Sequence, residues 1–284
     1  MKPMKQVLRL DPSTYRDALY GVEIEVEGNN LPTRLSSSVW RIERDGSLKS
    51  AEAYEYVTPH PLSLAGVRSS LDYLGAAYAT SRTSVDESIR AGVHVHMNVQ
   101  DWNIKQLFTF TTMYYVLEDI LTRWCGPARE GNLFCLRSKD AEFVLFRVLE
   151  ALNNKNLRLL KDDTIRYSSL NYCSLFKYGS IEFRGMRGTG DLDAIYNWVQ
   201  IINDLRESSL KFDDPVSVIS TMSGDGGRAF LDRVLPNTAK LLGDVNDADE
   251  LISESTRRVQ MLAFGVNWAS MGGKSVNIFK EEVW

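Results

Sequence analysis

Two of the three histidines in this chain lie one residue apart, in residues 92–98 with the sequence Gly-Val-His-Val-His-Met-Asn. Apolar side chains alternate there with His94, His96 and Asn98. Successive side chains of a β-strand point to opposite faces, so both imidazoles and the amide would share one face. The pattern predicts a strand with one polar face and a reverse face that packs into a core.

Two further segments show the same alternation. In residues 21–27 three glutamates alternate with aliphatic residues, and in residues 180–184 Glu182 and Arg184 alternate with apolar ones. If these strands neighbour the histidine strand, their polar faces converge. Crowded carboxylates raise one another's pKa unless a cation lies among them. Oxygen-rich ligands with little nitrogen suit Mg²⁺ or Mn²⁺, and the adjacent arginine indicates a metal-bound polyphosphate.

Short motifs follow one another in a fixed order over about residues 20–200, roughly two thirds of the chain. They are Gly-Val-Glu-Ile-Glu (21–25), Asp-Gly-Ser-Leu (45–48), Glu-Tyr-Val-Thr-Pro (55–59), Gly-Val-His-Val-His (92–96), Asn171, and Ile-Glu-Phe-Arg (181–184) followed by Gly188 and Thr189. This ordered set resembles the putative amidoligase family, a branch of the glutamine synthetase and glutamate–cysteine ligase superfamily.

The resemblance implies which residues act. The implied metal ligands are Glu23, Glu25, Glu55, His94 and Glu182. Glu52 is a rival for the place of Glu55, which spacing alone does not separate. Arg184 would contact phosphate, with Arg187 as a possible helper, and His96 would contact the phosphate or the substrate. Arg184, Glu55 and His96 form the implied catalytic set, while Asn171 would bind substrate or nucleotide or else satisfy the sheet.

Each motif also has a plainer interpretation. Alternating glutamates on a strand are usually a solvated face, and Glu27 fits the motif less well than its neighbours. A His-x-His pair can bind zinc, but His60 is the one histidine left to complete such a site. Glu182 and Arg184 could be a surface ion pair worth little. Asp45 and Ser47 suit a turn for local reasons. The residues 272–275 (Gly-Gly-Lys-Ser) lack the first glycine of a phosphate-binding loop.

Composition narrows the classes of protein. The 284 residues are 44% hydrophobic and 25% charged, with a net charge of −4. No basic excess favours direct nucleic-acid binding or a membrane surface. The three cysteines, Cys125, Cys135 and Cys173, lack metal-site spacing, so we expect free thiols and a cytoplasmic protein. The N-terminus lacks a signal-peptide core, and no apolar run approaches the ~20 residues of a membrane helix.

The order of elements predicts an α+β fold. Strands are expected at 21–27, 40–43, 52–58 and 92–98, and a hairpin at 166–176 and 180–185 that turns at 177–179. Helices are expected at 62–80, 103–124, 141–153, 191–212, 227–242 and 247–264. The sheet would be antiparallel or mixed and covered by helices on one face. The resemblance implies a glutamine-synthetase-like cradle.

We expect one domain over residues 1–284, with a motif-bearing core at about 20–212 and a helical extension packed on it at 213–284. The charged segment 126–140 would be a lid or a linker. The resemblance implies an ATP- and Mg²⁺-dependent (or Mn²⁺-dependent) carboxylate–amine ligase that acts through an acyl phosphate. Its partners would be an acid and an amine, the amine being free or carried by a peptide, a cell-wall precursor or a modified base. A kinase-like transferase and a non-catalytic nucleotide- or metal-binding module are the alternatives, and the sequence leaves the oligomeric state and the general base open.

Overall fold

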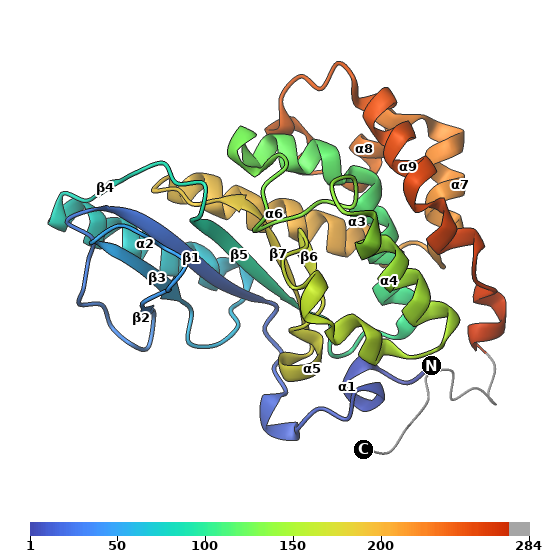
Figure 1. Cartoon of the computed structure of the whole chain (residues 1–284), viewed down its shortest axis with the longest axis horizontal. Coiled ribbons are helices and arrows are strands. Elements are labelled where there is room, and N and C mark those ends of the chain that lie inside the picture. The colour runs from blue at the N-terminus through green and yellow to red at the C-terminus, as the bar shows by residue number, and fades with distance from the viewer. Residues whose placement is uncertain (273–284) are drawn as a thin grey trace.

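The computed structural model describes residues 1–272 and combines helices with an antiparallel sheet, so the predicted α+β class is confirmed (Figure 1). The six strands of the main path run in the order β2-β3-β1-β5-β7-β6, and β4 pairs with β1 at one end. Every pairing is antiparallel. The strands are β1 (Tyr20–Asn29), β2 (Arg41–Glu43), β3 (Ala53–Val57), β4 (Ser84–Val85), β5 (Gly92–Asn98), β6 (Leu170–Asn171) and β7 (Ser180–Arg187).

Helices cover one face of this sheet. α2 (Leu64–Ser81) contacts β1, α3 (Ile104–Cys125) contacts β7, and α6 (Leu192–Ser209) packs on both helices (Figure 1). The C-terminal helices α7 (Pro215–Asp225), α8 (Gly227–Val234) and α9 (Ala248–Phe264) lie beyond α3, away from β1–β3 (Figure 1). The remaining α-helices of the described chain are α1 (Met4–Val7), α4 (Glu142–Asn153) and α5 (Leu175–Tyr178). None of the helices formed by residues 1–272 combines the length and hydrophobicity that a membrane span requires.

The alternation in β1 divides its side chains between two environments. Val22, Ile24 and Val26 are at most 1% exposed and belong to the core beneath the helices. Each fully buried aliphatic side chain stabilises the fold by roughly 1.5–3 kcal/mol. A shift of one residue in register would move all of them to the other face, so this apolar row fixes which face the glutamates occupy.

The register places the polar residues in rows across the open face. Glu23 lies opposite His94 of β5 on one side and Val57 of β3 on the other, and Val57 lies opposite Arg41 of β2. In the next row Glu25, Glu55 and Glu43 are aligned, and in the row on the other side His96, Glu182 and Asn171 are aligned. Directly opposed residues share one face of the sheet.

The predicted hairpin at 166–185 is correct in its pairing and wrong in its shape. β6 has two residues, and the connection to β7 contains α5 instead of a tight turn. The amide of Cys173 donates to the side chain of Asn171, which turns the chain away from the sheet, and Gly179 ends α5 with φ +67°. Local side-chain hydrogen bonds therefore stop the strand early.

The C-terminal region also differs from the prediction. The helix predicted at 227–242 ends at Val234, because Pro236 cannot donate a backbone hydrogen bond, and a 3₁₀ turn follows at Ala239–Leu242. The prediction missed α7, which Asp214 begins with a capping box and Pro215 at its first position. Residues 273–275 of the discounted phosphate-loop match lie outside the described residues.

Candidate functional site

Glu23 of β1 lies between the two histidines of β5. Its Oε2 is 3.4 Å from Nδ1 of His94, and its Oε1 is 3.2 Å from Nε2 of His96. The second contact lacks hydrogen-bond direction, so the buried Nε2 of His96 has no hydrogen-bond partner among the described residues. Nε2 of His96 nevertheless faces a carboxylate oxygen, and His96 is among the residues that could hold a metal ion there.

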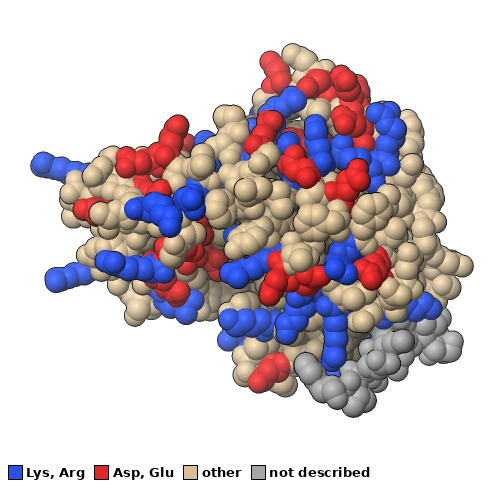
Figure 2. All heavy atoms as spheres, viewed as in Figure 1, with Lys and Arg blue, Asp and Glu red and all other residues tan. Residues whose placement is uncertain are grey.

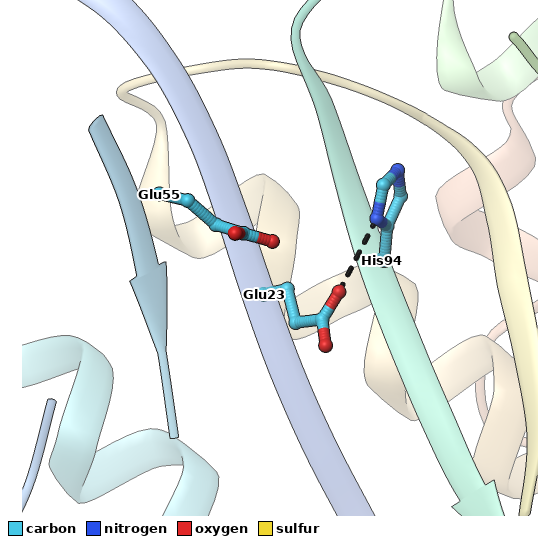
Figure 3. A group of neighbouring side chains, drawn as sticks. All are labelled: Glu23, Glu55 and His94. Atoms are coloured by element: carbon cyan, nitrogen blue, oxygen red, sulfur yellow. Dashed lines mark hydrogen bonds and ion pairs between the residues drawn. The ribbon is translucent and has the colours of Figure 1, made fainter. Parts of the chain in front are cut away.

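Glu55 of β3 points across β1 toward the same place (Figure 3). One ligand atom from each of Glu23, Glu55 and His94 lies within 4.8 Å of the others, and the same holds for Glu23, His96 and Glu182. Glu23 therefore belongs to two triads of possible metal ligands. Glu52 lies elsewhere, exposed, where its carboxylate accepts from the amide of Leu31 at 3.4 Å.

Glu25 lies behind these triads. Its Oε2 accepts from the amide of Gly92 at 2.8 Å, and its Oε1 is 3.9 Å from Nε2 of His94. A Cβ on Gly92 would lie 3.1 Å from that nitrogen and 3.3 Å from Nη2 of Arg129. The position opposite Glu25 must therefore stay free of a side chain for these groups to approach one another.

Glu182 of β7 joins the cluster from the other side. Its Oε1 is 3.6 Å from Nδ1 of His94 and accepts from Arg184 Nη1 at 2.5 Å, while its Oε2 accepts from Asn171 Nδ2 at 2.7 Å. Asn171 thus supports Glu182 from behind and lines neither of the cavities described below. Arg184 also donates to the carbonyl of Phe134 at 3.3 Å.

The acids of the cluster titrate differently from one another. Burial raises the pKa of Glu55 to about 8, helped by repulsion from Glu23 and Glu25, and burial likewise raises the pKa of Glu25. Burial opposes ionisation of Glu23 as well, but His94 and His96 outweigh it and hold the pKa of Glu23 below its usual range. In the same way His96 and Arg184 hold the pKa of Glu182 low against burial. Such opposed shifts in one cleft are typical of a functional site.

Two cavities of about 410 Å³ each meet at Glu23. The arginine cavity lies on the Glu25 side, where four acids (Glu23, Glu25, Asp45, Glu55) face four arginines (Arg90, Arg129, Arg166, Arg184) with Phe134 and Tyr167. The proline cavity lies on the His96 side and has apolar walls from Leu19, Val57, Pro59, Pro61 and Tyr178. Over the whole face seen in Figure 2, acidic and basic side chains are mixed.

Sequence reasoning missed most of the arginine cavity. Arg90, Arg166 and Tyr167 belong to no matched motif, and Arg129 lies in the charged segment 126–140, for which the sequence predicts only a lid or a linker. Backbone hydrogen bonds attach that segment to residues 167–169. The amide of Leu136 donates to the carbonyl of Tyr167, and the amide of Ser169 donates to the carbonyl of Leu136. It forms a wall of the site together with residues 166–169.

Two buried acids of α3 hold this wall. The carboxylate of Glu118, fully buried, accepts from the amide of Ser138 at 2.8 Å and from the hydroxyls of Ser138 and Ser169. Asp119 accepts from Arg137 of the wall at 3.4 Å and from Arg258 of α9 at 2.6 Å. The wall is thereby connected to the helix behind it and to the C-terminal helices.

Glu27 and Asn98 of the predicted strands take no part in the cluster, and the prediction that Arg187 helps to bind phosphate is wrong. Arg187 donates to the carbonyl of Cys125 at 2.9 Å, at the end of α3, and lines neither cavity. Glu27 accepts from the amides of Lys49 and Ser50. Asn98 donates to the carbonyls of Arg16 and Ala18. Glu27 and Asn98 thus fasten loops to the sheet, and Arg187 connects the sheet to the end of α3.

A family model described as "Putative amidoligase enzyme" matches residues 14–205, most of the chain. The protein therefore belongs to this family, and membership indicates a ligase. The matched range contains all seven strands that residues 1–272 form and the whole carboxylate–histidine cluster. No curated protein matches the chain.

Proposed function

We propose that this protein is an ATP-dependent carboxylate–amine ligase built on a glutamine-synthetase-like sheet. The observation that carries the proposal is the position of Glu23. It is shared by two ligand triads and lies where two cavities meet, with Arg184 at the edge of one of them. Two substrates can thus enter from opposite sides and react over one cluster of charged groups.

The residues fit divalent cations. Glu23, Glu55 and His94 would hold one ion and Glu23, His96 and Glu182 a second, with Glu25 supporting the first. Carboxylate oxygens with few nitrogens suit Mg²⁺ or Mn²⁺. The raised pKa of Glu55 indicates crowded carboxylates, and Nε2 of His96, which is 3.2 Å from Oε1 of Glu23 but not hydrogen-bonded to it, offers a nitrogen for a cation beside that oxygen. Bound cations would neutralise the oxygens of a triphosphate during transfer.

The two cavities have different walls, and this difference is the basis on which we place each substrate. A nucleobase needs apolar and aromatic surface, which the proline cavity offers in Tyr178, Pro59 and Pro61. Groups with negative charge need cations, which the arginine cavity offers. We place the base of ATP in the proline cavity, its terminal phosphate beside Glu23, and the acid in the arginine cavity.

The reaction has two balanced steps. An oxygen of the substrate carboxylate attacks the γ-phosphorus of ATP, the bond to the β-phosphate oxygen breaks, and ADP leaves. The amine then attacks the acyl carbon, phosphate leaves with the bonding electrons, and the amine loses a proton. Arg184 faces the cavity in which both steps occur, and a fixed guanidinium there stabilises charge that shifts between phosphate oxygens.

An ATP-dependent condensation screen tests the proposal. The full chain with Mg²⁺ and ATP would be mixed with amino acids and other acids in combination with amines, and products would be read by mass while ADP release is followed. We expect a product lighter by one water than the sum of an acid and an amine, with one ADP per product. ADP release without any amine requirement, together with a stable phosphorylated acid, would instead identify a kinase-like transferase.

A further inference from the structure

Three of the four arginines of the arginine cavity have no carboxylate partner among the described residues. Arg184 is paired with Glu182 at 2.5 Å, whereas Arg90, Arg129 and Arg166 make no ion pair there. Four acids and four arginines line the cavity, and the acids are the groups that would bind metal cations. Cations bound to the acids would therefore leave these three guanidinium groups as positive charge in excess.

Arg129 is the most unusual of the three. It is 0% exposed, and its guanidinium is held by two backbone carbonyls, Ala91 at 3.3 Å and Arg184 at 2.7 Å. Its Nε has no hydrogen-bond partner among residues 1–272. A buried charge that is neither paired nor fully hydrogen-bonded is strongly unfavourable, so an anion at the cavity wall would relieve it.

Arg90 and Arg166 come from separate segments and are oriented by aromatic rings. The guanidinium carbon of Arg90 lies 5.5 Å from the ring centre of Phe134, and that of Arg166 lies 5.7 Å from the ring centre of Tyr167. The two rings pack edge to face at 6.1 Å. Cation–π contacts of this kind hold a guanidinium in place without using its N–H groups, and one of the N–H groups of Arg90 donates to the carbonyl of Ser47 at 3.4 Å.

We propose that Arg90, Arg129 and Arg166 bind a second anionic group of the acid substrate, at the end away from the carboxylate that is phosphorylated. The inference rests on the proposed function and narrows its substrate class to acids that carry two anionic groups. Arginine suits this task because its planar donors match a carboxylate or a phosphate in two places. Arg90 and the wall segments 126–140 and 166–169 then select the acid, while Glu23 and its neighbours carry the transfer.

Calorimetry with matched acids tests the subsite. The full chain, with Mg²⁺ and a non-hydrolysable ATP analogue, would be titrated with succinate, glutarate and adipate and with the half-amide of each. We expect at least one diacid to bind tenfold or more tightly than its half-amide. Arg90→Gln and Arg166→Gln should each reduce that ratio at least fivefold without changing the affinity for the ATP analogue. Arg44→Gln is the matched control, since Arg44 lies 6.0 Å from the ring centre of Tyr54 and lines neither cavity.

Two outcomes would overturn the subsite. One is equal binding of every diacid and its half-amide. The other is a loss of affinity for the ATP analogue in Arg90→Gln and Arg166→Gln, which would make these residues polyphosphate contacts. A parallel titration of the same acids with Mg²⁺ but without the ATP analogue distinguishes a failure of this inference from a failure of the proposed function. A diacid preference that persists while the ATP analogue fails to bind would keep the subsite and reject the ligase.

Discussion

Nε2 of His96 lies 3.2 Å from Oε1 of Glu23, yet the two atoms form no hydrogen bond. Both side chains are positioned by directly paired strands, since Glu23 is opposite His94 and His96 is opposite Gly21. The absence of a side chain at Gly21 leaves the imidazole open to the proline cavity. The pair is thus arranged for a third atom between them, which is the basis of the first prediction.

Replacing Glu23 should abolish metal binding by both triads. For the intact protein, Mg²⁺ and ATP at a hundred times their dissociation constant should raise the free energy of unfolding by about 2.7 kcal/mol. Glu23→Gln keeps the size of the side chain but removes its charge, so we expect most of this rise to vanish in thermal unfolding. Glu43→Gln, on the same face but outside both triads, should retain it. An equal rise in both variants would show that Glu23 is not a ligand.

Arg184→Lys should separate turnover from binding. The lysine keeps the charge but loses the planar fork, so a group that acts on the transferred phosphate should lose on the order of a hundredfold in kcat. We expect the affinity for ATP to stay within about tenfold in the same variant. Arg187→Lys is the control from the same strand, because Arg187 binds the carbonyl of Cys125. Steady-state kinetics with a productive acid and amine would decide, and an unchanged kcat in Arg184→Lys would reject its role.

Metal binding should release a proton near neutral pH. Burial, with repulsion from Glu23 and Glu25, raises the pKa of Glu55 to about 8, so without metal this carboxyl is largely protonated at pH 7. A cation must displace that proton, whereas above pH 9 it finds a carboxylate already formed. Titrating Mg²⁺ calorimetrically in buffers of different ionisation enthalpy should show at least one proton released at pH 7, since Glu23 also raises the pKa of His96, a ligand of the second triad, against the effect of burial. In Glu55→Gln the number of protons released on Mg²⁺ binding should fall by about one, because the amide carries no proton that the cation must displace.

Because of Glu118, the free energy of unfolding should decrease as the pH rises. Burial raises its pKa from an ordinary 4.5 to about 7 despite hydrogen bonds from Ser138 and Ser169. Between these values the folded state binds more protons than the unfolded state, so stability present below about pH 4.5 is lost as the pH rises through 7. Denaturant titrations of Glu118→Gln should show a flatter decline over this window.

Removing the Glu118 carboxylate altogether should be severe. Glu118→Ala leaves the buried amide and hydroxyl of Ser138 and the hydroxyl of Ser169 without their acceptor, at about 1–3 kcal/mol for each group. We expect a loss of about 3 kcal/mol or more in the free energy of unfolding. Glu130→Ala, an exposed acid of the same wall, should change it by less than about 0.5 kcal/mol.

The strands of the site could be predicted because their pattern repeats every two residues. The apolar rows of β1 and β5 fix which face the acids and histidines occupy, so the meeting of Glu23, His94 and Glu182 follows from sequence once the strands are neighbours. The position of Arg129 does not, because it depends on a loop. That loop is held by hydrogen bonds from Ser138 and Ser169 to Glu118, and such distant pairings leave no periodic signal.

The sequence could not decide between Glu52 and Glu55 as the metal ligand. Both acids are near the start of one strand, and only the register with Glu25 shows that Glu55 faces the cluster. The hairpin at 166–185 failed for the opposite reason, since the side chain of Asn171 offers the backbone a local partner that the strand pattern does not reveal.

The salt bridges of Asp119 limit where this protein can be truncated or joined to a relative in a chimera. The family match ends at residue 205, but Asp119 inside it pairs with Arg258 of α9 beyond it, and α9 packs along α3. A fragment that stops at the family boundary would expose one side of α3 and remove one of the two arginines that pair with the buried Asp119. Chimeras between relatives would therefore have to inherit α3 and α9 from the same parent.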